Sequence, residues 1–276
     1  MRVAVIGHVE WIEFVRVARV PAAGDIVHAR DTWEGPGGGG AVAAAQLARL
    51  ADDCIFFTAL GDDDLGARAR RELSALGLRL EAATRPGRQR RGLTFVDDTG
   101  ERTITVIGER LAPHAADPLA WDLLTDCDAV YVTAGDPDAL RLARRARKLV
   151  TTARISALLR AAGIEVDALV GSAHDPAERY APGDLHPPPR LVVRTAGAAG
   201  GTYEALGHAP RPYPAAPLPG PVADAYGCGD SFAAGLTYAL GAGLDPDDAV
   251  RLAARCGAAA LTGRGPHGGQ LDRSTL

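Results

Sequence analysis

Short runs of β-branched and aliphatic residues alternate along the chain with longer alanine-rich stretches. A short apolar run is typical of a buried strand, whereas apolar residues that recur once per helical turn indicate a helix. The pattern predicts strands at residues 2–7, 54–60, 129–135, 165–171 and 190–197, and helices at residues 41–51, 65–77, 137–149, 229–241 and 246–262. This alternation indicates an α/β fold, in which a mainly parallel central sheet is flanked by helices.

Two segments interrupt the alternation. Residues 11–33 switch between apolar and polar positions in short runs, and residues 92–107 form a hairpin pattern whose turn is "DDTGE". They are either two unrelated surface hairpins or the two parts of one small antiparallel sheet. We expect the second arrangement, a β-sheet lid that is discontinuous in sequence and built from about residues 11–36 and 88–108 of a single domain spanning residues 1–276.

The composition is typical of a globular protein with a sizeable core. The chain has 276 residues, of which 47% are hydrophobic and 23% are charged, and its formal net charge is −4. This balance favours neither nucleic acid nor an anionic membrane as a partner. No apolar run is long enough to span a membrane, and the N-terminal apolar stretch is too short for a signal peptide. We therefore expect a cytoplasmic protein.

Two features of the composition exclude whole classes of site. The only lysine, Lys148, lies in the basic helical stretch "LARRARKLV", and the chain contains no asparagine. A P-loop needs a Gly-Lys-Ser/Thr sequence, so that mode of phosphate binding is excluded. We expect Lys148 on a solvated helix face rather than in a Schiff base. The four cysteines lack Cys-x-x-Cys spacing, which indicates neither a disulfide framework nor a zinc site.

A run of glycines, Gly37 to Gly40, stands directly before the predicted helix at 41–51. Such a run either lets a ligand approach the backbone N–H groups or forms a flexible loop tip. A second glycine cluster, "GCGDSF", does not fit the dinucleotide-binding pattern Gly-x-Gly-x-x-Gly, because Phe232 stands where the third glycine belongs. The glycine clusters therefore do not support a Rossmann fold.

The stretch "DAYGCGDSFAAGL" joins a glycine turn to an acidic residue and then a helix. A turn built on Gly227, Cys228 and Gly229 presents successive N–H groups at the helix N-terminus, where anions bind. Asp230 is then either an ordinary helix cap or a general base that takes the proton of a hydroxyl. In the second case the N–H groups hold the transferred phosphoryl group. The residues alone leave both interpretations open.

Three motifs together resemble those of the ribokinase-like (PfkB) family of sugar and nucleoside kinases. They are "GGGGAVAAAQLARL" with "FFTALGDDDLG", then "VVRTAGAAG", and finally "DAYGCGDSFAAG", in that order along nearly the whole chain. The resemblance implies a parallel-sheet core with a β lid, ATP and Mg²⁺ as cofactors, and a primary hydroxyl of a sugar-like molecule as the phosphoryl acceptor. It also implies a homodimer formed through the lid.

The resemblance assigns roles residue by residue. Asp230 would be the base, with Gly227, Cys228 and Gly229 as the anion hole. The residues that would bind the nucleotide and its metal and phosphates are Thr195, Gly197, Gly200, Ser172, Asp175 and Ala254. Asp224 and the carbonyl of Ala260 fall where some members of the family bind a monovalent cation, which predicts a K⁺ site.

Several positions depart from the family pattern. Ser172 to Asp175 stand where the family has an Asn-x-x-Glu motif near the metal and phosphates, and Ala254 stands where an asparagine can lie near the adenine. Two further departures concern the acceptor. Ile12 stands where the family has an aspartate that holds sugar hydroxyls, and Gly39 stands where it has an asparagine. We expect the acceptor to be bound instead by His8, Glu10, Glu13, Gly37, Gly38, Gly39 and Gly40. In the alternative arrangement, the two glutamates face solvent on the lid.

The leading functional hypothesis is an ATP-dependent kinase that acts on a sugar or sugar-like compound. A nucleoside kinase is the first alternative, because apolar Ile12 and neighbouring Trp11 favour a base or aglycone. A catalytically silent regulator that binds a ligand is the second alternative. The departures at Ile12 and Gly39 favour this regulator, whereas the intact "GCGD" turn opposes it.

Overall fold

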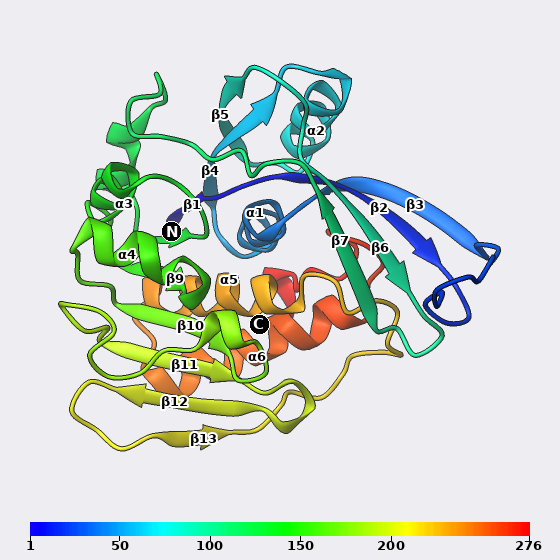
Figure 1. The fold of residues 1–276 in the computed structure, drawn as a ribbon. Helices are drawn as coiled ribbons and strands as arrows, with labels where there is room; N and C mark the ends of the chain where they lie inside the picture. The colour runs from blue at the N-terminus through cyan, green and yellow to red at the C-terminus, as the bar shows by residue number, and fades with distance from the viewer.

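The computed structural model describes residues 1–276, and its largest element is a nine-stranded sheet (Figure 1). The parallel strands, in spatial order, are β11 (Leu191–Thr195), β10 (Ala168–Ser172), β9 (Leu149–Thr152), β8 (Ala129–Val132), β1 (Arg2–Ile6), β4 (Asp53–Gly61) and β5 (Arg79–Arg85). Beyond β11 the sheet continues with two antiparallel strands, β12 (Gly201–Ala205) and β13 (Arg211–Tyr213). The predicted parallel α/β core is confirmed.

Six α-helices surround the main sheet. They are α1 (Gly39–Leu50), α2 (Asp64–Ser74), α3 (Pro137–Ala143), α4 (Ser156–Ala162), α5 (Cys228–Gly241) and α6 (Pro246–Leu261). Short 3₁₀ helices occupy Trp121–Asp126, Ala153–Ile155, Pro176–Glu178, Gly197–Ala199 and Arg273–Thr275. No helix combines the length and the apolar character that crossing a membrane requires.

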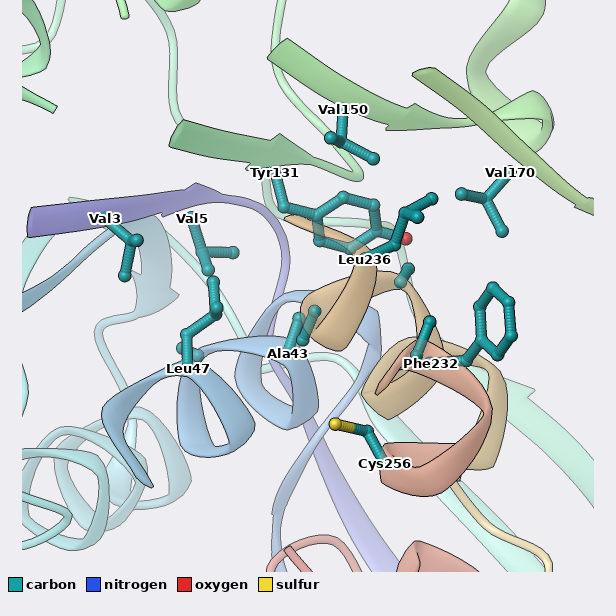
Figure 2. Close-up of a cluster of buried hydrophobic side chains, with 14 of the residues drawn as sticks. Val3, Val5, Ala43, Leu47, Tyr131, Val150, Val170, Phe232, Leu236 and Cys256 are labelled. Atoms are coloured by element: carbon teal, nitrogen blue, oxygen red, sulfur yellow. The ribbon is translucent and has the colours of Figure 1, made fainter. Parts of the chain in front are cut away.

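Alternate residues of each central strand enter two different cores, because successive side chains of a strand point to opposite faces. Val3 and Val5 of β1 belong to a cluster of 34 buried residues that includes side chains of α1, α5 and α6. Ala4 and Ile6 belong to a cluster of 21 buried residues on the other face, with α3 and α4. Figure 2 shows Leu47 of α1 beneath β1 in the first cluster. Burial on both faces explains why these strands appear as continuous apolar runs.

A second sheet of four strands projects from the main sheet on the side where β1 ends (Figure 1). Its order is β3 (Asp31–Gly37), β2 (Glu10–Arg16), β6 (Arg91–Val96) and β7 (Arg102–Ile107). We call it the small sheet. Its inner face carries Ile12, Phe14 and Val96, which pack against Val42 of α1 and Tyr226 in a cluster of their own. The two irregular segments therefore form one separate sheet, as predicted.

The pairing within the small sheet differs from the prediction. The outer pairs β3–β2 and β6–β7 are antiparallel, but the central pair β2–β6 is parallel. Each segment contributes one hairpin-like pair, and the first strand of the second pair runs in the same direction as β2. The sheet is mixed because two separate chain excursions meet side by side.

The predicted helix at 137–149 is wrong in its second half. Helix α3 ends at Ala143, and the next arginine, Arg144, turns back so that its guanidinium lies 2.6 Å from Asp167 Oδ2. Residues 149–152 then form β9, a central strand that was not predicted because its apolar run is so short. Lys148 stands just before β9 and lies 3.4 Å from Asp167 Oδ1, so it is not on a helix face. Strand β5 was also not predicted, since charged residues interrupt its pattern.

We predict that Leu47→Ala lowers the free energy of unfolding by about 2–5 kcal/mol, because Leu47 is fully buried between α1 and the main sheet. Urea denaturation measures the change. Arg49→Ala is the matched control on the same helix: its side chain is exposed and lies 3.9 Å from Asp272, so the change should stay within about 0.5 kcal/mol. Equal losses in the two variants would contradict the placement of Leu47 in the core.

Candidate active site

The N-terminus of α5 lies in an open turn built on glycines. Gly227 precedes the helix with φ of 74°, a left-handed conformation that suits glycine, and a Cβ there would lie 2.8 Å from Val42 Cγ1. Along the helix, Ser231 is the first residue whose backbone N–H donates to a backbone carbonyl, and its acceptor is Gly227 O at 2.9 Å. The N–H groups of Cys228 and Gly229 have no backbone acceptor, and the space beside the Gly229 Cα is open. This geometry is suited to an anion.

Asp230 follows this turn in the first turn of α5, and its carboxylate accepts no hydrogen bond from the helix. It is therefore not a side-chain cap. Burial, followed by the charge of Glu178, raises its pKa to about 6, although the charges of Arg102 and Arg154 act in the opposite direction. Asp230 is thus a carboxylate without a hydrogen-bond partner, and its pKa lies close to neutral pH.

The glycine run packs directly against Asp230. A Cβ on Gly39 would lie 2.7 Å from Asp230 Oδ1, and a Cβ on Gly40 would lie 2.7 Å from His8 O. Gly38 has φ of 86°, and its N–H donates to Tyr226 Oη at 2.8 Å. The run is largely buried, so it is not a flexible loop tip. These contacts bring the run, the end of β1 and the start of α5 together.

His8 and Glu10 line the other side of the glycine run. A Cβ on Gly38 would lie 3.2 Å from the His8 ring and 3.3 Å from Glu10 Cγ. Glu10 Oε1 lies 3.7 Å from His8 Nε2 and 2.8 Å from Arg90 Nε. Burial, with Arg110, Arg90 and Arg154 nearby, lowers the pKa of His8 to about 3, so its imidazole is neutral. Burial raises the pKa of Glu10.

Glu13 does not join this group. Side chains alternate along β2, so Glu10 and Ile12 point to the inner face of the small sheet and Glu13 points to the outer face. There Glu13 Oε1 lies 2.7 Å from Arg91 Nη2. Ile12 is fully buried, and a Cβ on Gly37 would lie 2.9 Å from it. The position of the family's aspartate is therefore occupied by apolar side-chain volume.

The residues expected at the nucleotide lie at the carboxyl ends of neighbouring strands. Ser172 of β10 and Thr195 of β11 are register partners, and the turn after β11 contains Gly197 and Gly200, both with positive φ. A Cβ on Gly200 would lie only 2.1 Å from Tyr213 O, so this turn requires glycine. In parallel sheets, ligands bind at this edge.

The other two residues expected to bind the nucleotide, Asp175 and Ala254, lie elsewhere. Asp175 accepts a hydrogen bond from Ala177 N at 2.9 Å and pairs with Arg154 at 2.5 Å. Ala254 lies on α6, one turn before Gly257, whose Cβ position would be 3.2 Å from Cys228 O. Asp175 is therefore held in a local network, while Ala254 lies one turn from the glycine that packs against Cys228.

Sequence reasoning missed four charged residues of the site, Arg90, Arg110, Arg154 and Glu178. Glu178 Oε2 accepts a hydrogen bond from Ser172 N at 2.7 Å, and its other oxygen lies 2.6 Å from Arg154 Nη2. Arg154 follows β9, the central strand that was not predicted, and an arginine at the carboxyl end of such a strand is the signal that could have found it. No group of three His, Cys, Asp or Glu side chains is arranged to hold a metal ion.

The carboxylate of the expected cation site, Asp224, has hydrogen-bond donors for both of its oxygens. Asp224 is buried, and its oxygens accept hydrogen bonds from Tyr226 N at 2.8 Å and Gly265 N at 3.0 Å. Its own N–H donates to Leu261 O at 3.3 Å, next to Ala260. Asp224 thus joins the segment before α5 to the turn after α6, and the two expected cation residues are close together.

Comparison with known proteins identifies the family. The chain matches the sequence profile of the pfkB family carbohydrate kinases over residues 1–164 and 142–272. The chain belongs to this family. An ATP-dependent ribose-1-phosphate kinase of Halopiger xanaduensis is 34% identical over 157 residues, which cover 55% of this chain and 52% of that relative. The matched part is therefore about half the length of that curated relative.

Two solved structures share the fold over nearly the whole chain. The microbiome-derived acarbose kinase Mak1 is 25% identical with a TM-score of 0.80, and the match covers 99% of this chain and 96% of that one. Ribokinase of Thermotoga maritima is 19% identical with a TM-score of 0.77 and the same coverage. The ribokinase-like fold expected of this pfkB member is confirmed.

We predict that Asp230→Asn makes the protein more stable above pH 6. The pKa of Asp230 is raised from its unfolded value to about 6, so its favourable contribution is complete below the unfolded pKa and is lost as pH rises through 6. The asparagine variant avoids this loss. Its free energy of unfolding in urea should exceed that of the wild type by about 1–3 kcal/mol at pH 8, and by almost nothing below about pH 4.

The matched control for this stability measurement is Asp245→Asn. Asp245 is also an aspartate at a helix N-terminus, but its side chain accepts a hydrogen bond from Asp248 N at 3.0 Å. Asparagine keeps such a cap, so the control should show no gain at pH 8. A loss of stability in Asp230→Asn at pH 8 would show that the carboxylate stabilises the fold.

Proposed function

We propose that this pfkB family member transfers the γ-phosphate of ATP to a primary hydroxyl of a sugar-like acceptor, with Asp230 as the general base. One observation carries the proposal: Asp230 is a carboxylate without a hydrogen-bond partner, and it follows the N–H groups of Cys228 and Gly229, which have no backbone acceptor at the start of α5. A group with a pKa near 6 is largely ionised at neutral pH, yet basic enough to take a proton from a hydroxyl as attack proceeds.

In this reaction the acceptor hydroxyl loses its proton and receives the phosphoryl group. The acceptor hydroxyl gives its proton to Asp230 while its oxygen attacks the γ-phosphorus, and the bond from that phosphorus to the leaving ADP oxygen breaks. The N–H groups of Cys228 and Gly229 stabilise the oxygens of the group in transfer. Gly227 supports this role through its left-handed conformation, which orients the turn.

The nucleotide is assigned to the edge formed by the ends of β10 and β11. Thr195, Gly197, Gly200 and Ser172 line this edge, and Asp175 and Ala254 stay predictions for the same ligand. Mg²⁺ usually binds through substrate phosphates, one or two carboxylates and water, which fits a site without a cage of protein ligands. Bound there, the ion would neutralise charge on the phosphates. Glu178, whose charge acts on Asp230, would hold the ion in exchange for its present contact with Arg154.

His8, Glu10, Gly38, Gly39 and Gly40 form the wall assigned to the acceptor. Glu10 supplies acceptor oxygens for sugar hydroxyls, and neutral His8 supplies a ring nitrogen. Glu13 is left out, because it lies on the outer face of the small sheet. A sugar-like acceptor agrees with the family and with the names of the relatives, a ribose-1-phosphate kinase and an acarbose kinase.

The remaining hypotheses have weaker support. The hypothesis of a nucleoside acceptor rests only on the apolar character of Ile12 and Trp11. Trp11 is fully buried, and Arg68 Cζ lies 4.3 Å from the centre of its ring. A silent regulator has no need of a carboxylate whose ionisation costs stability, such as Asp230. A homodimer formed through the small sheet and K⁺ binding at Asp224 and Ala260 stay predictions.

We predict that Asp230→Asn lowers kcat by about 10²–10⁴-fold while nucleotide affinity stays nearly unchanged, because asparagine keeps the size of the side chain but cannot take the proton. Release of ADP, coupled to an optical readout, is measured across pentoses, hexoses, sugar phosphates and nucleosides. Asp245→Asn is again the control and should keep wild-type turnover. Undiminished turnover per folded molecule in Asp230→Asn would refute the assignment of the base.

We also predict an acid limb in the pH profile of the wild-type enzyme. Below pH 6 the base becomes protonated, so kcat/KM should fall by about tenfold per pH unit. Calorimetric titration of ADP over the same pH range separates this effect from any change in nucleotide binding. A profile that stays level down to pH 5 would mean that no base with this pKa takes part.

A further inference from the structure

The first turn of α5 is held in place by few bonds of its own. The N–H groups of Cys228 and Gly229 have no backbone acceptor, and the carboxylate of Asp230 accepts no hydrogen bond from the helix. One side-chain hydrogen bond joins this turn to another part of the chain: Ser231 Oγ donates to Gln270 Oε1 at 3.0 Å. Because Ser231 directly follows Asp230, the bond restrains the residue next to the carboxylate.

Gln270 belongs to a segment that is bonded to both helices of the site. We call this segment, residues 265–271, the C-terminal strap. Its bond to α1 runs through Gln46, whose side chain donates to Leu271 O at 2.8 Å and accepts from Leu271 N at 3.0 Å. Gln270 makes the bond to α5 one residue earlier. The strap therefore ties α1 to α5, whose first turns meet at the site.

The strap is a firm anchor for the bond to α5. A Cβ on Gly269 would lie 2.6 Å from Ala259 O, so the strap packs backbone to backbone against α6. The amide of Gln270 is oriented within the strap, because its Nε2 donates to Pro266 O at 2.9 Å. Its Oε1 is then the atom that faces the hydroxyl of Ser231. The acceptor is thus set by the strap, independently of α5.

The two ends of this bond differ in how they are packed. Gln270 lines a cavity of about 340 Å³ together with Arg49, Leu76 and His267. On that side no packing holds the amide, so its position depends on its two hydrogen bonds. Ser231 is fully buried, and a buried hydroxyl that loses its acceptor is costly. The bond therefore restrains the buried start of α5 more than it restrains the strap.

We propose that Gln270 is a positioning residue for phosphoryl transfer: through Ser231 it holds the first turn of α5, and with it Asp230, against the glycine run. This inference rests on the proposed function, because the reaction that it supports is the transfer assigned there to Asp230. A Cβ on Gly39 would lie 2.7 Å from Asp230 Oδ1, so the carboxylate and the glycine run are already in close contact. A displacement of about 1 Å can slow such a reaction about 100-fold.

The test removes each end of the bond in turn. Gln270→Met keeps the length of the side chain without its amide, and Ser231→Ala removes the hydroxyl. Release of ADP is measured with the acceptor that the wild type uses best. We expect each variant to lose about 10–100-fold in kcat, while KM for ATP changes by less than about threefold, because the nucleotide edge at β10 and β11 is not disturbed.

The double variant tests whether the two residues act as one unit. Ser231→Ala combined with Gln270→Met should lose no more kcat than the worse of the two single variants, because both substitutions break the same bond. A loss equal to the product of the two single losses would show that Gln270 does not act through Ser231.

Thr237→Val is the matched control on the same helix. Thr237 is also fully buried, but its Oγ1 donates to Ala233 O at 2.8 Å within α5. Its loss should lower Tm without moving the first turn, so kcat should stay as in the wild type. Thermal unfolding shows which variants are folded at the assay temperature, and Ser231→Ala carries the test if Gln270→Met is not. Wild-type kcat in Ser231→Ala would overturn the inference, as would an equal loss in Thr237→Val.

The pH profile gives a readout that a general loss of stability does not move. A loosened first turn admits water to Asp230, so its pKa should fall from about 6 toward that of an exposed aspartate. The acid limb of kcat/KM should therefore move to lower pH by about half a unit or more in Gln270→Met. It should stay in place in Thr237→Val. An acid limb at the wild-type pH in Gln270→Met would contradict the inference.

A stability measurement separates this inference from the kinase proposal. Asp230→Asn should stabilise the wild type at pH 8, since burial opposes ionisation of the carboxylate. In the Gln270→Met background the same substitution should give about half this gain or less, because the carboxylate is better hydrated. A reduced gain supports the positioning role even if no acceptor is turned over, in which case the proposed function fails alone. An undiminished gain, with turnover that needs Asp230 but not Gln270, leaves the proposed function standing and refutes the positioning role.

Discussion

The site depends on backbone contacts that only glycine permits. A Cβ on Gly7 would lie 2.7 Å from Gly40 Cα, and a Cβ on Gly40 would lie 2.8 Å from Gly7 C. The end of β1 and the start of α1 therefore meet backbone to backbone, closer than any other residue allows. This contact determines how β2 and β3 leave the main sheet and brings Gly39 against Asp230 of α5. A larger residue at Gly7 or Gly40 would separate Asp230 from the wall assigned to the acceptor.

The charges of the site are carried mainly by groups that do not titrate near neutral pH. All but one of the 30 basic residues are arginines, which stay protonated under any working condition. His8 is held neutral by burial and by the arginines around it. Carboxyl groups are left to respond to pH, and Asp230 is the one with a pKa near 6. The chain thus combines a fixed positive charge with a carboxyl group, that of Asp230, whose protonation changes close to neutral pH.

Much of the fold follows from patterns that are visible in the sequence. Strands β1 and β4 are almost entirely apolar because both of their faces are buried, and α5 and α6 have helical periodicity. Strand β9 escaped prediction because its four residues, which follow an arginine-rich segment, carry too little periodicity to be separated from the helix before them. Glu10 and Glu13 stand an odd number of residues apart, so the alternation of side chains along a strand is enough to place them on opposite faces.

The arginines of the site could not be found in the same way, for a physical reason. A motif records residues that are near one another in sequence, whereas Arg90, Arg110 and Arg154 come from three separate connections that meet only in the fold. Their surroundings, not their neighbours in sequence, distinguish Arg154, which pairs with two carboxylates, from Arg90, which has only Glu10 and whose Nε forms no hydrogen bond. The motifs of this chain therefore identify the end of the site where phosphoryl transfer is proposed. The opposite end, which is assigned to the acceptor, becomes visible only through the pairing of β2, β6 and β7.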